Sequence, residues 1–331
     1  MRIITVSQNE AGQRLNKLLE KYLNLAPKSF VYKMLRKKNI TLNGKKCDGS
    51  EKLAHGDEIK LFLADETIEK FSKVSVQTVK KVSLDIVYED DHVLFINKPS
   101  GMLSQKAKEN DESLVEYVTD YLLDSGQLTR EDLQTFRPGI CNRLDRNTSG
   151  LVGAGKSLAG LQLLSEVWKD RTIHKYYQCI VAGKLEGQQE IQGFLKKDGR
   201  TNQVKVSKTE LPDSLPIRTE CEPLSTNGRY TLLKVTLITG RSHQIRAHLA
   251  SIGHPIVGDM KYGDAKVNEE VRSRYGIRSQ LLHSYKTVLP AMREPLSYLS
   301  GKEVTAPLPQ TFCRMMAGEG LLADSGVGKG G

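Results

Sequence analysis

The chain has 331 residues, enough for about two domains of roughly 150 residues each, and 38% of them are hydrophobic. Lys and Arg number 49 against 39 Asp and Glu, and the net charge of +10 suggests a polyanionic partner, although many soluble proteins are basic without one. No apolar run approaches the roughly 18 residues of a membrane span, the start lacks a signal-peptide pattern, and the five cysteines are widely spaced without a C-x-x-C pair. We therefore expect a cytoplasmic protein without disulfides, zinc or a membrane partner.

The first 65 residues are predicted to form a compact unit of short helices and strands. Apolar residues follow helical spacing in its first half, and a turn dipeptide between apolar runs predicts a hairpin in its second half. The predicted elements are a helix with Leu15, Leu18, Leu19 and Tyr22 on one face, a helix capped by Ser29, a hairpin from Ile40 through Asn43-Gly44, and a strand over Glu58–Leu63.

Positive charge is concentrated in one part of this unit. Between Lys21 and Cys47 there are eight basic residues and no acidic one. Such a stretch favours a cationic edge that binds phosphates with salt-dependent affinity, and an ordinary solvated helix face is the alternative. The residues of this unit that we expect to contact phosphates are Lys33, Arg36, Lys37, Lys38, Lys45 and Lys46.

The polar, lysine-containing residues 66–83 are predicted to be a linker, and a larger domain is predicted over 84–315. Short strands alternate there with a few helices, which favours an α+β domain on a largely antiparallel or mixed sheet. Residues 316–331 are glycine-rich and are predicted to be disordered. The expected strands are Val87, Val93–Ile96, Leu151–Ala154, Thr172–Ala182, Tyr230–Ile238 and Leu281–Val288, and the expected helices are Leu114–Leu123, Ser157–Trp168 and Ser242–Ile252.

Two polar segments of the larger domain are candidates for chemistry. In residues 137–150, Asp145 lies between Arg143 and Arg146 in a run of turn-forming residues, and an aspartate that only caps a turn is the plainer interpretation. In residues 240–249, His243 and Arg246 share a helix face, where the arginine is suited to clamp a carboxylate or phosphate. A surface arginine and a hydrogen-bonded core histidine are the alternative, and the histidine spacing disfavours a metal site.

The run from Gly150 to Ser157 satisfies the phosphate-binding pattern G-x-x-x-x-G-K-S. A nucleotide-binding loop of that type follows a buried strand, but the residues before Gly150 are polar and charged and the apolar residues fall inside the pattern. The match is therefore interpreted as coincidental, and a nucleotide hydrolase remains the weakest of the functional alternatives.

Taken together, these motifs resemble the RluA-type family of RNA pseudouridine synthases, over about residues 10 to 310. The family signature H-R-L-D-x-x-T-S-G is matched from Asn142 to Gly150, with Asn142 where most members carry His. The first 65 residues are similar to the αL RNA-binding module. Further matches are N-K-P-x-G at Asn97–Gly101, K-x-Y at Lys175–Tyr177, G-R-[ST]-H-Q-[IL]-R at Gly240–Arg246, and the runs Gly253–Asp259, Tyr262-Gly263 and Leu282-His283.

This resemblance implies an RNA pseudouridine synthase acting on structured RNA, most often large-subunit ribosomal RNA. It implies Asp145, Tyr177 and Arg246 as catalytic residues and Arg143, Thr148 and His243 as their support. Because the isomerisation loses no atom, no cofactor or metal is expected, and a monomer is expected. A non-catalytic RNA-binding protein of the same fold is the alternative, which the presence of Asp145, Tyr177 and Arg246 disfavours.

Overall fold

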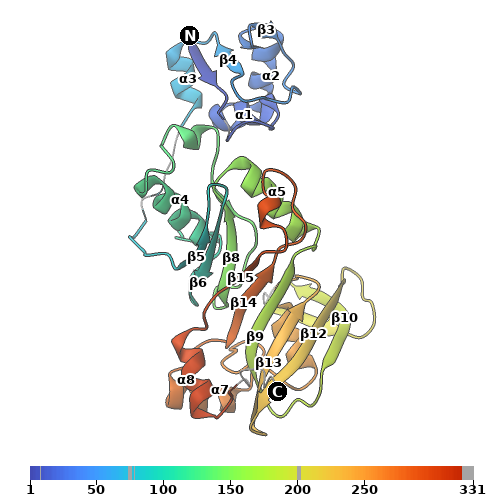
Figure 1. Ribbon diagram of the computed structural model, residues 1–331. Coiled ribbons are helices and arrows are strands. Elements are labelled where there is room, and N and C mark those ends of the chain that lie inside the picture. Colours follow the sequence, from blue (N-terminus) through green and yellow to red (C-terminus); the bar gives the residue numbers. More distant parts are fainter. Residues whose placement is uncertain (8, 74–76, 78, 200–202, 323–331) are drawn as a thin grey trace, which may run out of the picture.

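The computed structural model describes residues 1–7, 9–73, 77, 79–199 and 203–322, which form a small N-terminal unit at one end of a larger sheet domain (Figure 1). The N-terminal unit carries an antiparallel sheet in the order β1-β4-β2-β3. Its elements are β1 (Arg2–Thr5), α1 (Leu15–Tyr22), α2 (Lys28–Arg36), β2 (Ile40–Leu42), β3 (Lys45–Lys46), β4 (Glu58–Leu61) and α3 (Asp65–Phe71).

Most of the local predictions for this unit are confirmed. The four apolar residues at helical spacing are all buried on α1, where they form one side of the unit's core. Asn43 and Gly44 both adopt positive φ, as the two-residue turn between β2 and β3 requires. The expected cap at Ser29 is wrong: α2 begins at Lys28 directly after Pro27, whose missing N–H suits a helix start.

The larger domain is built on one mixed sheet, which confirms the α+β prediction. Its main path is β11-β10-β12-β13-β9-β14-β8-β6-β5, with β15 beside β14 and β7 beside β8. β14 and β8 pair in parallel, and the other neighbours are antiparallel. The elements are β5 (Ile86–Glu89), β6 (Val93–Lys98), α4 (Leu114–Asp124), η1 (Asp132–Gln134), β7 (Gly139–Ile140), β8 (Ser149–Gly155), α5 (Leu158–Lys169), β9 (His174–Ala182), β10 (Gln189–Asp198), β11 (Gln203–Ser207), β12 (Leu215–Thr226), β13 (Tyr230–Leu237), α6 (Gln244–Ser251), α7 (Ala265–Tyr275), β14 (Leu282–Val288), η2 (Ser297–Leu299), β15 (Glu303–Thr305) and α8 (Gln310–Gly318).

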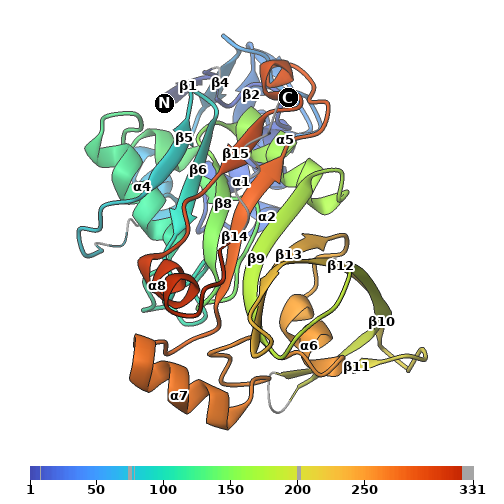
Figure 2. The ribbon, with the colours of Figure 1, turned by 60° about the horizontal axis from the view of Figure 1, so that its bottom comes forward.

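Helices cover both faces of this sheet. The side chains of β6 alternate between two cores: Leu94 and Ile96 pack with α4, whereas Phe95 packs with Leu164 and Trp168 of α5. Figure 2 shows α6 inside the curve formed by β10, β12 and β13. The strands β9, β14 and β8 lie in the middle of the sheet, and α6 packs against β11 and β12.

Two segments that we expected to be irregular contain helix. The predicted linker begins with α3, because Ile68 is buried against the N-terminal core and Asp65 and Glu66 lie in the first turn, where negative charge stabilises a helix. The predicted disordered tail begins inside α8, and Leu321 is fully buried beyond it. Residues 323–331 lie outside the described residues.

The N-terminal unit contacts the larger domain through a buried polar pair. Glu10 is 6% exposed, and its carboxylate accepts a hydrogen bond from the Thr135 hydroxyl just after η1. After α3 the chain crosses to α4, where the Lys81 ammonium pairs with Asp120 at 3.3 Å. No helix within the described ranges is long and apolar enough to cross a bilayer.

Candidate active site

Asp145 lies in the loop that joins β7 to β8, and this loop is anchored on both sides of the aspartate. Leu144 is buried in the main core, and its backbone exchanges hydrogen bonds with the Ser104 hydroxyl at 2.8 and 3.1 Å. Thr148 donates its N–H to the Asp145 carbonyl at 3.0 Å and closes a turn. The Asp145 side chain remains 26% exposed, so a fixed backbone presents an accessible carboxylate.

Lys98, the last residue of β6, holds this loop through hydrogen bonds to backbone carbonyls. Its fully buried ammonium donates to the carbonyls of Pro99 at 2.9 Å, Met102 at 2.9 Å and Arg146 at 3.1 Å. Gly101 adds a hydrogen bond from its N–H to the same Arg146 carbonyl at 2.9 Å. Burial lowers the pKa of Lys98 to about 7, while the negative charge of Asp145 opposes that shift. The N-K-P-x-G motif therefore holds the residue that follows Asp145.

Arg246, on α6, contacts two carboxylates at once. Its Nη1 donates to Oδ2 of Asp145 at 2.9 Å, and its Nε and Nη2 donate to the two oxygens of Asp259 at 2.7 and 2.8 Å. The paired contact with Asp259 fixes the plane of the guanidinium. The third nitrogen of the guanidinium, Nη1, is thereby directed at Asp145, which lies 101 positions away in the sequence.

The charges of this triad stabilise one another. The Asp259 side chain is 0% exposed and also accepts backbone N–H groups from Lys261 at 2.9 Å and Tyr262 at 3.2 Å. Burial disfavours the charged carboxylate, but the hydrogen bonds from Arg246 outweigh it and the pKa of Asp259 is lowered. Burial likewise opposes the charge on Arg246, yet the two carboxylates raise its pKa. The sequence prediction gave Asp259 no role, although it lies in a quoted motif.

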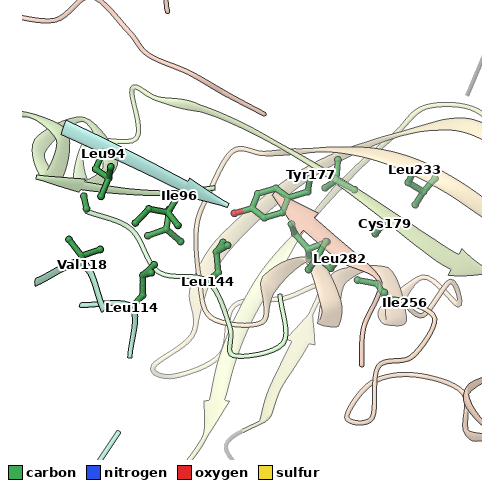
Figure 3. Close-up of a cluster of buried hydrophobic side chains, with 14 of the residues drawn as sticks. Leu94, Ile96, Leu114, Val118, Leu144, Tyr177, Cys179, Leu233, Ile256 and Leu282 are labelled. Atoms are coloured by element: carbon green, nitrogen blue, oxygen red, sulfur yellow. The ribbon is translucent and has the colours of Figure 1, made fainter. Parts of the chain in front are cut away.

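Tyr177, on β9, belongs to the same buried cluster as Leu144, the residue before Asp145. Figure 3 shows its hydroxyl turned toward Leu144 and Ile96 within a cluster of buried apolar side chains. Burial raises the pKa of Tyr177 to about 12, with a further contribution from the charge of Asp145, while a hydrogen bond with Ser284 of β14 opposes the shift. The phenol is therefore protonated near pH 7, and it lies next to the loop that carries Asp145.

His243 also faces Asp145, but through a different local structure from the one predicted. The expected helix cap at Ser242 is wrong, because α6 begins at Gln244 and His243 occupies the preceding position with a left-handed backbone, φ 55°. This conformation brings Nε2 of His243 to 3.9 Å from Oδ2 of Asp145. Burial lowers the pKa of His243 and Arg246 lowers it further, while Asp145 acts in the opposite sense.

The remaining residues of the signature loop have different surroundings. Thr148 is buried, and its hydroxyl accepts a hydrogen bond from the Gln280 amide at 3.3 Å. Arg143 is exposed and makes no ion pair with a described residue, so the structure does not bring it to the carboxylate. Asn142 bonds to the backbone of β8, donating to the Leu151 carbonyl at 3.2 Å and accepting from Gly153 N–H at 2.9 Å.

The segment that matches the phosphate-binding pattern is the strand β8 and not a loop. Lys156 is paired with Glu89 at 2.7 Å and donates to the Asp90 carbonyl at 2.6 Å, while Ser157 caps α5. A side chain at Gly155 would lie 2.3 Å from the backbone of Leu161. The glycines therefore allow close packing of β8, and the interpretation as a coincidental match is confirmed.

The six basic residues proposed to bind RNA lie at the end of α2 and on the adjoining β2–β3 hairpin. All six are exposed, and within the described part of the chain none of them forms an ion pair with an acidic side chain. Among the same described residues, no group of three or more His, Cys, Asp or Glu side chains is placed to hold a metal ion.

Comparison with family models identifies both units. Residues 92–251 match the model for RNA pseudouridylate synthase, and residues 13–59 match the S4 domain. Residues 92–251 include Asp145, Tyr177 and Arg246.

Relatives and solved structures agree with this assignment. The chain is 30% identical over 320 residues to the ribosomal large subunit pseudouridine synthase C of Vibrio cholerae, covering 93% of each chain. It is 29% identical over 299 residues to the protein of the same name from Escherichia coli K12, covering 86% of this chain and 87% of that one. Its fold is similar to that of human RNA pseudouridylate synthase domain containing 4, with a TM-score of 0.57 and 19% identity over 70% of this chain and 91% of that one. The chain therefore belongs to the RNA pseudouridylate synthase family and carries an N-terminal S4 domain.

Proposed function

We propose that this enzyme converts specific uridines of large-subunit ribosomal RNA to pseudouridine, with Asp145 as the catalytic carboxylate. The observation that carries the proposal is the position of the Arg246 guanidinium. Asp259 holds this guanidinium in place, and its Nη1 donates a hydrogen bond to Asp145 at 2.9 Å. The curated relatives, which are named for the ribosomal large subunit, support this class of substrate.

The reaction breaks the N1–C1′ bond of uridine, turns the base, and forms a C5–C1′ bond. The C5 proton leaves and N1 gains a proton, so the product is an isomer and no oxidant, reductant or group donor is needed. The reaction therefore requires a carboxylate positioned at the bond between sugar and base, and we propose that Asp145 is this carboxylate.

Tyr177 is proposed to bind the everted base. Taking a uridine out of its stack costs a few kcal/mol, and an aromatic ring that stacks on the base recovers about 1–3 kcal/mol. The ring of Tyr177 borders the catalytic loop in the largely apolar wall of Figure 3. We propose its hydroxyl as a relay for the C5 proton: because the phenol is protonated at rest, it takes up that proton only as it gives its own to solvent, from which N1 gains its proton.

The S4 domain is proposed to hold the RNA through its exposed cationic edge at Lys33, Arg36, Lys37, Lys38, Lys45 and Lys46. Arg143, exposed next to Asp145, is proposed to contact a phosphate near the target uridine. The five free cysteines support a reducing compartment, the cytoplasm, and we propose that the enzyme acts there as a monomer.

The decisive experiment maps pseudouridine in ribosomal RNA from cells with and without this protein. We expect at least one large-subunit uridine to lose modification in its absence and to regain it with the wild-type chain. The Asp145→Asn chain, expressed at the same level, is the matched control and should not restore it. Unchanged modification at every uridine of the large subunit would refute the proposed substrate.

A further inference from the structure

Tyr262 contacts both side chains that face Asp145. Its hydroxyl accepts a hydrogen bond from the Val204 N–H of β11 at 2.8 Å and lies 2.9 Å from Nδ1 of His243. The Arg246 guanidinium carbon lies 5.2 Å from the centre of the Tyr262 ring, and the rings of His243 and Tyr262 meet edge to face at 5.7 Å. One tyrosine therefore packs against both groups that surround the catalytic carboxylate.

The imidazole of His243 has one nitrogen toward each neighbour. Nδ1 meets the Tyr262 hydroxyl, and Nε2 lies 3.9 Å from Oδ2 of Asp145. Only 13% of the side chain is exposed, and burial lowers the pKa of His243. The ring is therefore neutral near pH 7 and carries a single proton, whose position depends on the partner of each nitrogen.

The hydrogen bonds of Tyr262 favour one position for that proton. A tyrosine hydroxyl carries one proton and two lone pairs. The Val204 N–H uses one lone pair, and among the described residues Nδ1 of His243 is the one acceptor within hydrogen-bond distance of the hydroxyl, which favours donation of the hydroxyl proton to Nδ1. The imidazole proton then lies on Nε2, the nitrogen that faces Asp145.

We propose that Tyr262 is a positioning residue that holds His243 with its proton on Nε2, directed at Oδ2 of Asp145. Arg246 binds the same oxygen through Nη1. No described residue donates a hydrogen bond to the other oxygen, Oδ1, which is therefore the oxygen presented to the nucleoside. A movement of about 1 Å on substrate binding brings Nε2 into hydrogen-bond distance of Oδ2. This inference rests on Asp145 acting on uridine as proposed above.

The first test measures the tautomer directly. In the full-length protein labelled with ¹⁵N-histidine, we expect the nitrogen chemical shifts of His243 to show a protonated Nε2 near pH 7. The Tyr262→Phe protein keeps the ring and should show a mixture of tautomers. A wild-type histidine protonated on Nδ1, or shifts that do not change in Tyr262→Phe, would overturn the inference. Because this measurement needs no substrate, it is independent of the proposed function.

The second test separates chemistry from binding. We expect Tyr262→Phe to lower kcat about ten-fold, the equivalent of about 1.4 kcal/mol, with KM and RNA affinity unchanged. Tyr88, on β5, donates a comparable hydrogen bond to Asp90 at 2.8 Å, and Tyr88→Phe should keep the wild-type rate. If the wild-type chain is active and Tyr262→Phe matches its kcat, Tyr262 has no positioning role.

A pair of substitutions at His243 tests the same point without altering Tyr262. A glutamine places an amide N–H near the position of Nε2, whereas an asparagine reaches only the position of Nδ1. We therefore expect His243→Gln to keep more of the wild-type kcat than His243→Asn, although asparagine is the better residue for a left-handed backbone. The opposite order would contradict an Nε2–H donor.

Discussion

At the scale of single residues, the position of the Asp145 carboxylate depends on a second carboxylate, that of Asp259, on the other side of Arg246. Asp259 is fully buried, and its two oxygens hold the guanidinium of Arg246. Without this partner, the arginine is free to rotate and to pair with Asp145 through other nitrogens. The geometry of the Asp145 carboxylate is thus set by one bidentate ion pair, between Arg246 and Asp259.

Asp259→Asn is expected to lower both stability and activity. Removing one partner of a buried ion pair typically costs about 3–5 kcal/mol, because the other charge stays buried. We expect a loss of that size in the free energy of unfolding, measured with urea, and a lower kcat. Glu166→Gln breaks an exposed pair with Arg293 and should change stability by less than about 1 kcal/mol. Equal effects of the two substitutions would show that Asp259 is not an anchor.

The lowered pKa of Asp259 also predicts how stability depends on pH. A carboxyl group whose pKa is lower in the folded state than in the unfolded state stabilises the fold above the unfolded value, about 3.9. That contribution is lost as the pH falls through the folded pKa. The free energy of unfolding should therefore fall more steeply below about pH 4 in the wild type than in Asp259→Asn. If the free energies of unfolding of the two proteins fall in parallel with pH, Asp259 is not the cause of the acid dependence.

At the scale of elements, the strand β8 depends on glycines for its close packing. Gly150 has φ 111°, and a Cβ atom there would lie 2.2 Å from the Ser284 carbonyl of β14. This close approach joins the two strands in parallel beside the loop that carries Asp145. Next to it, the Ser149 hydroxyl lies 2.9 Å from Nδ1 of His283 and ties the same pair of strands.

Gly150→Ala is expected to destabilise the protein by about 3 kcal/mol or more, since the new methyl group meets backbone and the φ angle disfavours alanine. Gly199→Ala is the matched control, because a Cβ atom there meets nothing within 4 Å and its stability should change by less than about 0.5 kcal/mol. Urea unfolding of both variants makes the comparison. A Gly150→Ala protein as stable as the control would mean that β8 and β14 separate at little cost.

Local sequence patterns predicted the elements that depend on interactions between residues close together in the chain. The apolar spacing of α1 and the Asn43-Gly44 turn each involve interactions within a few residues, and both appear as expected. The strand β10 was not predicted, because its charged and polar residues weaken the alternating pattern, and β11, which does alternate, is only 5 residues long. The start of α6 was misplaced because the left-handed conformation of His243 comes from tertiary contacts and not from a capping side chain.

The candidate site was predictable only in part for the same reason. The composition around Asp145 and Arg246 marked each segment as unusual, but the contact between them joins residues 101 positions apart. Only the family resemblance linked the two segments. Asp259 and Tyr262 were quoted without roles, because the hydrogen bonds that define their roles exist only in the folded chain.

At the scale of the whole molecule, the S4 domain carries a cationic edge and the larger domain carries Asp145, the carboxylate that we propose to be catalytic. The Glu10–Thr135 hydrogen bond joins the two units in a buried contact. If the exposed lysines of the S4 domain hold RNA as proposed, this contact fixes the orientation of the larger domain toward that RNA. Substitutions in the S4 domain are therefore expected to change RNA affinity, and substitutions around Asp145 are expected to change the rate of the reaction.

The double substitution Lys37→Ala/Lys45→Ala should weaken RNA binding and reduce its dependence on salt. Each lost phosphate contact is expected to lower the slope of log affinity against log salt by about one. The control Lys266→Ala/Arg272→Ala changes the same net charge on α7 and should leave the slope unchanged. The slopes are measured by titrating a ribosomal RNA fragment at several salt concentrations. Identical slopes for the two variants would exclude the edge from RNA binding.

The most direct test of the account compares wild-type and Asp145→Asn protein in single-turnover reactions on ribosomal RNA that contains the mapped uridine. Asparagine keeps the size of the side chain and removes its negative charge, so the fold and RNA affinity should be preserved. We predict rapid pseudouridine formation by the wild type and none by Asp145→Asn at equal RNA occupancy. Formation of pseudouridine by Asp145→Asn at the wild-type rate would contradict the catalytic role of this carboxylate.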